Sequence, residues 1–235
     1  MMDAIRRLAD RLAETPATFH WLRKLPEANY RETKRRIARV LEQVEADLAS
    51  RCPRGEPQAS GEGGAEGAHQ LAKVLDLGCG TGEYAELFDP GRYLGVDIHP
   101  GYVAFAQRRR PAHRFLVADV RTWSGEDQRF DLVMVNGVLH HLDDTGVQEF
   151  LRTAQRLTAP GGTLLVIEDV DLAEPPLGTR LVHLLDHGEH IRDAARWQAL
   201  ISAVAPIARS ETYVSGICPY HLMVCAPGER SAPGR

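Results

Sequence analysis

Long hydrophobic runs are absent from this sequence of 235 residues. No apolar stretch approaches the roughly 20 residues that a membrane-spanning helix needs. The N-terminus also lacks the apolar core of a signal peptide. We therefore expect no membrane-spanning segment, and we expect the chain to act in the cytoplasm.

The sequence also has few cysteines and no excess of basic residues. The four cysteines, Cys52, Cys79, Cys218 and Cys225, lack the spacing of a metal site or of a disulfide framework, so reduced thiols are expected. The net charge is -4, which does not favour a nucleic-acid partner. With 43% hydrophobic and 26% charged residues, the composition predicts one globular domain with additions.

The most distinctive stretch that is present is residues 74–82, which read VLDLGCGTG. A short apolar run around Asp76 predicts a buried strand that leads into a glycine turn. Residues 83–88 predict the first turns of a helix, whose free N–H groups would face the glycine loop. A strand, a glycine loop and a helix in this order predict a nucleotide-type ligand site.

Before this stretch, the chain shows two amphipathic helical patterns and then a segment rich in glycine and proline. The long helix predicted at 30–50 could cover the ligand site or could pack against the flank of the domain, and both alternatives stay open. The predicted organisation is a helical extension (1–50), a flexible linker (51–70), the ligand-binding domain (71–228) and a disordered tail (229–235).

After the glycine loop, predicted strands alternate with predicted helices. Such alternation is typical of an α/β domain with a parallel sheet. The strands are expected at 74–77, 93–98, 115–120, 130–138 and 163–170, and the helices at 101–110 and 147–157.

The GxGxG spacing, with an acid two residues before the first glycine, resembles motif I of the class I S-adenosylmethionine-dependent methyltransferases. Residues 138–142, VLHHL, are similar to the end of that family's fourth strand. Residues 157–162, LTAPGG, are similar to its turn before the fifth strand, although Thr158 or Ala159 replaces the usual basic residue. The resemblance covers about residues 70–170 and a last strand at 220–226.

This resemblance implies a doubly wound, Rossmann-like α/β fold. Its sheet would have seven strands, six parallel and the last antiparallel, with helices on both faces. It also implies methyl transfer from S-adenosylmethionine to a small-molecule acceptor by in-line displacement. Two alternatives stay open: an NAD-dependent oxidoreductase, and a non-catalytic S-adenosylmethionine-binding subunit of a partner. The GxGxG spacing, Asp119 and the PGG turn argue against the first.

The family's cofactor contacts transfer to specific positions of this chain. Asp97 follows the loop by about twenty residues, where a carboxylate can reach ribose hydroxyls, although a helix N-cap is an alternative. Asp119 would bind the adenine amino group and Val120 would meet the ring, or Asp119 would only cap the strand end. The complete predicted set is Asp76, Gly78, Cys79, Gly80, Gly82, Asp97, Ile98, Asp119, Val120, Asn136 and Gly137.

A catalytic base is a further hypothesis, because oxygen and nitrogen acceptors react better after losing a proton. A histidine suits this role near neutral pH. His140 is the preferred residue, while His141 could serve in packing. Glu168 and Asp169, at the end of the fifth strand, are alternatives, as is catalysis by proximity without a base.

Residues 174–206 are expected to build the acceptor pocket. Their three histidines, His183, His187 and His190, could indicate a metal. Because no HExxH or paired-cysteine spacing accompanies them, we expect a polar, partly exposed helix and no metal.

Overall fold

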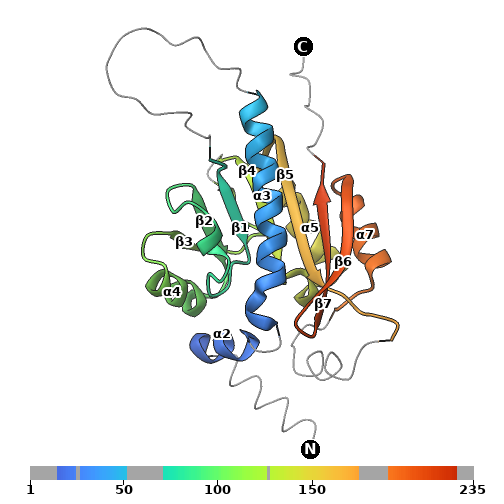
Figure 1. Ribbon diagram of the computed structural model, residues 1–235, viewed down its shortest axis with the longest axis horizontal. Coiled ribbons are helices and arrows are strands. Elements are labelled where there is room, and N and C mark those ends of the chain that lie inside the picture. Colours follow the sequence, from blue (N-terminus) through green and yellow to red (C-terminus); the bar gives the residue numbers. More distant parts are fainter. Residues whose placement is uncertain (1–14, 25–26, 52–70, 126–127, 175–189, 227–235) are drawn as a thin grey trace, which may run out of the picture.

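A single seven-stranded sheet organises the chain (Figure 1). The structure is a computed structural model that describes residues 15–24, 27–51, 71–125, 128–174 and 190–226. The strand order is β3-β2-β1-β4-β5-β7-β6. The strands are β1 (Val74–Leu77), β2 (Tyr93–Asp97), β3 (Arg114–Val117), β4 (Phe130–Asn136), β5 (Thr158–Asp169), β6 (Ile207–Ser215) and β7 (Cys218–Cys225).

The strand directions confirm the predicted fold. β7 runs antiparallel to β5 and β6, and the other six strands are parallel to one another. β1 lies at the centre, where Leu75 pairs with Leu94 of β2 and with Val133 of β4. All four residues of β1 are buried, because a parallel sheet is covered on both faces.

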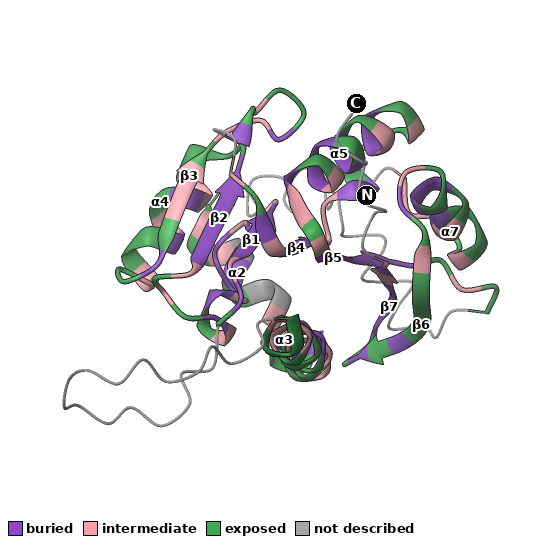
Figure 2. Ribbon diagram, turned by 90° about the horizontal axis from the view of Figure 1, so that it is seen from above, coloured by how far each residue is buried: buried purple, intermediate pink, exposed green. Residues whose placement is uncertain are grey.

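Helices cover both faces of this sheet, as predicted. Figure 2 shows α3 (Arg31–Arg51) against one face, and α5 (Asp144–Leu157) with α7 (Ala194–Ser202) against the other. α4 (Pro100–Arg109) packs on β2 and β3. Among the described residues, no helix combines the length and the apolar character required to cross a bilayer.

α3 confirms the long helix predicted at 30–50. Its residues Ile37, Val40 and Val44 are buried at helical spacing and pack into a hydrophobic cluster with side chains of β1, β4, β5 and β7. The short 3-10 helix η1 (Ala28–Tyr30) precedes α3 and reaches the ligand pocket described below. The N-terminal segment therefore both packs on the sheet and contributes to the pocket.

The helix predicted at residues 83–88 is wrong. Only a 3-10 helix, η2 (Ala85–Leu87), forms there. Pro90 follows closely and disfavours helical backbone in the residue before it, so the segment turns early into β2. α3 occupies part of the sheet face that an α-helix after β1 would have covered.

Other elements also differ from the sequence interpretation. α2 (Pro16–Lys24) is a separate short helix within the helical extension predicted at 1–50. β3 ends at Val117, so Asp119 and Val120 lie in the loop after it. The sequence assigned no position to the seventh strand, which is β6, and α7 lies within residues 174–206, where a helix is expected. Several predicted features lie outside the described residues. They are the first N-terminal helical pattern, almost all of the linker, the tail, His183 and His187.

Candidate active site

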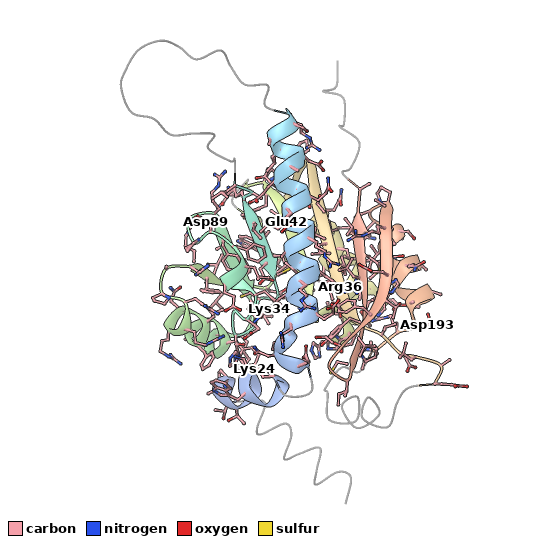
Figure 3. The ribbon with its side chains drawn as sticks, in the orientation of Figure 1. Lys24, Lys34, Arg36, Glu42, Asp89 and Asp193 are labelled. Atoms are coloured by element: carbon pink, nitrogen blue, oxygen red, sulfur yellow. The ribbon has the colours of Figure 1, made fainter. Side chains whose placement is uncertain are left out.

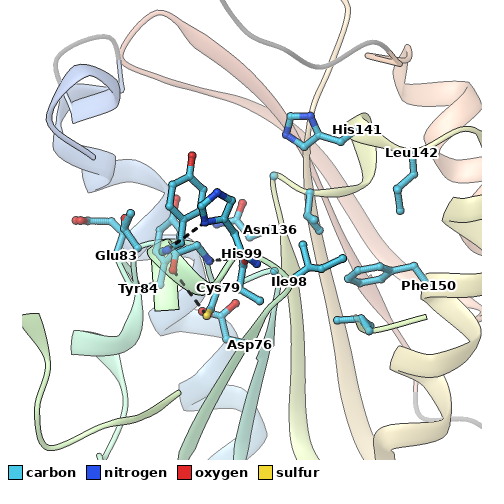
Figure 4. A pocket seen from close by; sticks show the side chains of 18 of the residues that line it. Asp76, Cys79, Glu83, Tyr84, Ile98, His99, Asn136, His141, Leu142 and Phe150 are labelled. Carbon is cyan, nitrogen blue, oxygen red and sulfur yellow. Dashed lines mark hydrogen bonds between the residues drawn. The ribbon is translucent and has the colours of Figure 1, made fainter. Parts of the chain in front are cut away.

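A cavity of about 400 Å³ opens at the carboxyl ends of β1, β2 and β4 (Figure 4). The strand order reverses at β1, because β2 and β4 lie on opposite sides of it. In open α/β sheets, ligands bind in the crevice at such a switch point. The predicted cofactor residues lie around this cavity, with the exception of Gly82.

The glycine loop leaves room for a ligand. Gly80 has a φ of +51°, and a Cβ added there would meet no protein atom within 4 Å. Its missing side chain therefore keeps the cavity open. Gly78 is required for packing within the protein, because a Cβ at this position would lie only 2.9 Å from the Val138 side chain in the turn after β4. Gly82 packs against α4 and β3, where a Cβ would approach Ala106 and Phe115 at 3.0 Å.

Asp97 joins this loop to the end of β2. Its carboxylate accepts hydrogen bonds from the backbone N–H groups of Gly80 and His99, both at 2.8 Å. Burial raises the pKa of Asp97, while these two bonds act in the opposite sense. The side chain that caps α4 is His99, so Asp97 is not the N-cap of that helix. A carboxylate in this position can accept hydroxyl groups of a ligand.

Asp76 lies below the loop and is 2% exposed. The Tyr93 hydroxyl donates to it at 2.8 Å. Burial raises the pKa of Asp76 to about 7, the Tyr93 bond lowers it, and the negative charge of Asp97 raises it further. The pKa of Asp76 is therefore near neutrality, and its hydrogen bond with Tyr93 links β1 to β2 beneath the pocket.

An apolar slot lies on the β2 and β3 side of the pocket. Val120 is buried, Ile98 is 61% exposed, and Leu142 and Phe150 approach from the turn after β4 and from α5. Asp119 lies at the same end and accepts from the Arg121 guanidinium at 2.8 Å, which lowers the pKa of Asp119. Apolar side chains beside a hydrogen-bonding acid suit a flat heteroaromatic ring.

The two adjacent histidines have different environments. His140 is 0% exposed, and its Nδ1 lies 2.8 Å from Glu168 and 3.6 Å from Asp169. His141 lines the pocket, whereas His140, Glu168 and Asp169 do not. The preference for His140 as the acceptor-facing residue therefore has no support in this geometry.

Glu168 organises the 3-10 helix η4 (Leu139–His141), which carries both histidines. One carboxylate oxygen accepts from the backbone N–H groups of Val138 and Leu139, at 3.0 and 2.8 Å. The other oxygen contacts the N–H group and the ring of His140. Glu168 thus positions the turn that presents His141 to the pocket.

An ionic cluster surrounds Glu83, directly after the glycine loop. Lys34 of α3 lies 2.5 Å from its carboxylate, Arg109 of α4 lies 3.5 Å away, and Lys24 of α2 lies 3.9 Å away. Figure 3 labels Lys24 on α2 and Lys34 on α3, the two helices from which these side chains extend. Three helices are therefore tied electrostatically to the loop that lines the pocket.

Several pocket residues have no local sequence signal. Glu27 and Tyr30 come from the turn before α3, and Tyr220 comes from the start of β7. Tyr84 is the exception, because its position directly after the glycine loop could have identified it. In the part of the chain that the structure describes, no group of His, Cys, Asp and Glu side chains has the arrangement of a metal site.

Residues 74–162 match a family model described as a methyltransferase domain. These residues therefore form a methyltransferase domain. The matched residues run from β1 into the start of β5 and thus include the glycine loop, Asp97, His140 and His141.

Two curated methyltransferases are similar to this chain in sequence. A trans-aconitate 2-methyltransferase of Variovorax paradoxus is 34% identical over 111 residues, which are 46% of this chain and 42% of the relative. The protein of the same name from Methylobacterium nodulans is 32% identical over 187 residues, which are 78% of this chain and 62% of the relative. The chain therefore spans less than two thirds of the length of either relative.

A solved methyltransferase structure supports the fold. The N-methyltransferase NodS from Bradyrhizobium japonicum, in complex with S-adenosyl-L-homocysteine, is 20% identical with a TM-score of 0.53. The alignment covers 66% of this chain and 78% of that protein. This likeness shows that the methyltransferase domain shares the Rossmann-like fold.

Proposed function

We propose that this chain transfers the methyl group of S-adenosylmethionine to a small-molecule acceptor. The observation that carries the proposal is the junction of the open glycine loop with Asp97 at the switch point of the sheet. The match to a methyltransferase domain and the two curated relatives support the same function.

In this proposal, the cofactor lies along the carboxyl edge of the central strands. Asp97 accepts the ribose hydroxyls, and Asp119 with the backbone of Val120 meets the adenine. Gly78, Gly80, Asn136 and Gly137 surround the methionine part. The open space beside Gly80 fits such a ligand, because any side chain at this position would project into the cavity.

When bound, the sulfonium of the cofactor supplies an electrophilic methyl group. The task of the protein is then to align the acceptor and to exclude water. We propose His141 rather than His140 as the histidine that faces the acceptor, because His141 lines the pocket and His140 does not. His140 and Glu168 act as positioning residues for its turn.

Calorimetry tests the cofactor, and a transfer assay tests the reaction. We expect the full chain to bind S-adenosylhomocysteine in the micromolar range or tighter and to bind NAD at least a hundredfold more weakly. Binding of NAD alone would support the oxidoreductase alternative. The transfer assay uses labelled S-adenosylmethionine with a metabolite extract, and includes trans-aconitate because two relatives carry its name. Cofactor binding without label transfer would favour a non-catalytic subunit.

A further inference from the structure

The glycine loop has few side chains that the rest of the protein can hold. Within residues 78–82, three positions are glycines with positive φ values, and Cys79 and Thr81 carry the side chains. Glycine loses more conformational freedom than other residues when its backbone becomes ordered. The thiol of Cys79 makes its hydrogen-bond contact within the loop itself, at 4.0 Å from the carbonyl of Gly80. Thr81 is therefore the side chain through which other elements can fix this loop.

The side chain of Thr81 is held by α2, a helix of the N-terminal extension. The Thr81 hydroxyl lies 3.1 Å from Nδ1 of His20, and the two residues are 6% and 2% exposed. α2 packs on α4 beside it (Figure 1), where the rings of His20 and Phe105 have their centroids 5.5 Å apart. α2 lies outside residues 74–162, so this contact is an addition to the matched methyltransferase domain.

His20 holds Thr81 as a neutral side chain. Burial lowers the pKa of His20 to about 4, and the charge of Arg109 acts in the same direction, whereas that of Glu83 raises it. The Glu83 carboxylate lies 3.5 Å from Nδ1 of His20. Because an ionised carboxylate only accepts hydrogen bonds, it favours the tautomer that carries hydrogen on Nδ1. In this tautomer, the His20 ring donates to the Thr81 hydroxyl.

The second ring nitrogen of His20 indicates that this side chain serves more than packing. Nε2 is buried, and among the described residues it has no hydrogen-bond partner. A buried polar atom without a partner destabilises a protein, whereas an apolar ring of similar size would pack against Phe105 without that penalty. The contact between Nδ1 and Thr81 is the interaction that an apolar ring could not make.

This contact acts on the wall of the cofactor pocket. Thr81 lines the cavity next to Gly80, whose N–H group donates to Asp97 at 2.8 Å. α4 holds Thr81 by a second bond, from the Arg109 guanidinium to the Thr81 carbonyl at 3.3 Å. A loop that is fixed in its binding conformation before the ligand arrives loses less entropy on binding. The contact with His20 should therefore raise the affinity for the cofactor.

We propose that α2 is part of the cofactor site and that His20 is a positioning residue, which fixes the glycine loop through the Thr81 hydroxyl. This inference rests on the proposed methyl transfer, because it assigns a determinant of cofactor affinity in the same pocket. Thermodynamic linkage makes the coupling reciprocal: if the docking of α2 strengthens cofactor binding, cofactor binding stabilises the docked α2 by the same factor.

Calorimetry with S-adenosylhomocysteine measures this coupling in the full chain. His20→Phe keeps a ring against Phe105 but removes the Nδ1 contact, and it should weaken binding at least fivefold. Thr81→Val should weaken binding by a similar factor, while Thr81→Ser, which keeps the hydroxyl, should stay within twofold of wild type. In the Thr81→Val background, His20→Phe should weaken binding less than twofold, because its partner is already absent.

A second threonine–histidine pair provides the matched control. The Thr212 hydroxyl lies 2.8 Å from Nδ1 of His221, which is 3% exposed, and neither residue lines the pocket. Thr212→Val and His221→Phe should leave the affinity for S-adenosylhomocysteine within twofold, even where they lower the denaturation midpoint as much as His20→Phe does. If these controls lose as much affinity as the His20 and Thr81 variants, the effect follows stability and the assignment is overturned.

Hydrogen exchange of the α2 amides provides the reverse measurement. Saturation with S-adenosylhomocysteine should slow exchange in residues 17–24 at least fivefold in wild type and less than twofold in Thr81→Val. If wild type binds S-adenosylhomocysteine and exchange in α2 does not change, the inference fails while the proposed function stands. If wild type binds no S-adenosylhomocysteine, the proposed function fails, and this inference fails with it. Should His20→Phe not fold, the Thr81 variants and the exchange in wild type decide the question.

Discussion

At the scale of single residues, Asp97 has two partners in the protein and, in our proposal, a third in the ligand. Its carboxylate fixes the N–H groups of Gly80 and His99, so the same side chain shapes the loop and faces the cavity. Charge-assisted hydrogen bonds of this kind are stronger than neutral ones. A change at Asp97 should therefore affect ligand binding more than it affects folding.

We expect Asp97→Asn to weaken S-adenosylhomocysteine binding by roughly 2–4 kcal/mol, because charge-assisted bonds in a partly buried site are lost. Calorimetry at constant pH measures the effect. Asp89→Asn is the matched control: Asp89 is exposed and also accepts a backbone N–H, from Gly91, but it does not line the pocket. A folded Asp97→Asn variant with wild-type affinity would contradict the ribose assignment.

The raised pKa of Asp76 leads us to expect that the stability of the protein depends on pH. Its folded pKa, about 7, lies above the unfolded value of 3.8, so the folded state binds more protons between these values. Its contribution to the free energy of unfolding is therefore largest at acid pH and is lost as the pH rises to about 7. We expect a loss of roughly 2 kcal/mol between about pH 5 and pH 7.

Urea denaturation of wild type and Asp76→Asn across this range measures the loss. The variant lacks this component, so the stability of wild type relative to the variant should fall by this amount as the pH rises from about 5 to 7. Burial lowers the pKa of His20 to about 4, so His20 changes stability in the opposite sense between about pH 4 and 6.5. Because His20 is present in both proteins, the difference between their curves isolates Asp76. Parallel curves would refute the prediction.

At the scale of elements, the turn after β4 depends on a residue of β5. Glu168 accepts from three successive backbone N–H groups and from His140. We expect Glu168→Ala to reduce the free energy of unfolding by about 3–5 kcal/mol, because these buried donors and the His140 ring lose their acceptor. Guanidinium denaturation measures this loss, and Glu149→Ala, at an exposed position of α5, is the control.

A double variant separates pairing from general disruption. If Glu168 acts largely through His140, Glu168→Ala combined with His140→Ala should cost less than the sum of the two single changes. Additive losses would mean that the backbone contacts of Glu168 carry the stabilisation alone. A loss below about 1 kcal/mol in Glu168→Ala would exclude the positioning role.

At the scale of the whole molecule, α3 belongs to the core of the domain. Ile37 is 0% exposed and shares a hydrophobic cluster with strands at the centre of the sheet. We expect Ile37→Ala to lower the free energy of unfolding by about 2–4 kcal/mol while unfolding stays a single transition. Circular dichroism and tryptophan fluorescence during denaturation measure both properties. Glu42→Ala, on the exposed side of the same helix (Figure 3), should change stability by less than about 0.5 kcal/mol.

Two separate transitions in Ile37→Ala would show that α3 folds apart from the sheet. The predicted division into an extension at 1–50 and a domain from 71 would then describe the folding units. A single transition would instead mean that the sheet needs α3 to cover its apolar face.

Local features of the sequence sufficed for much of the fold. Residues 74–82 carry a buried strand and a glycine loop within nine positions, and the apolar spacing in α3 and α5 marks their buried faces. The alternation of strands and helices predicted the parallel sheet. These features could be recognised because hydrophobic periodicity and backbone freedom at glycine act over a few neighbouring residues.

Only the tertiary structure decided which side chains share the pocket. Glu27 and Tyr220 are far apart in the sequence, but both line the pocket, because β7, which carries Tyr220, pairs with β5 at the centre of the sheet. Likewise, adjacent residues of one turn place His140 in the interior and His141 at the cavity, because Glu168 holds the ring of His140 from another strand. Long-range packing and buried hydrogen bonds determine such directions, and no short stretch of sequence contains both partners.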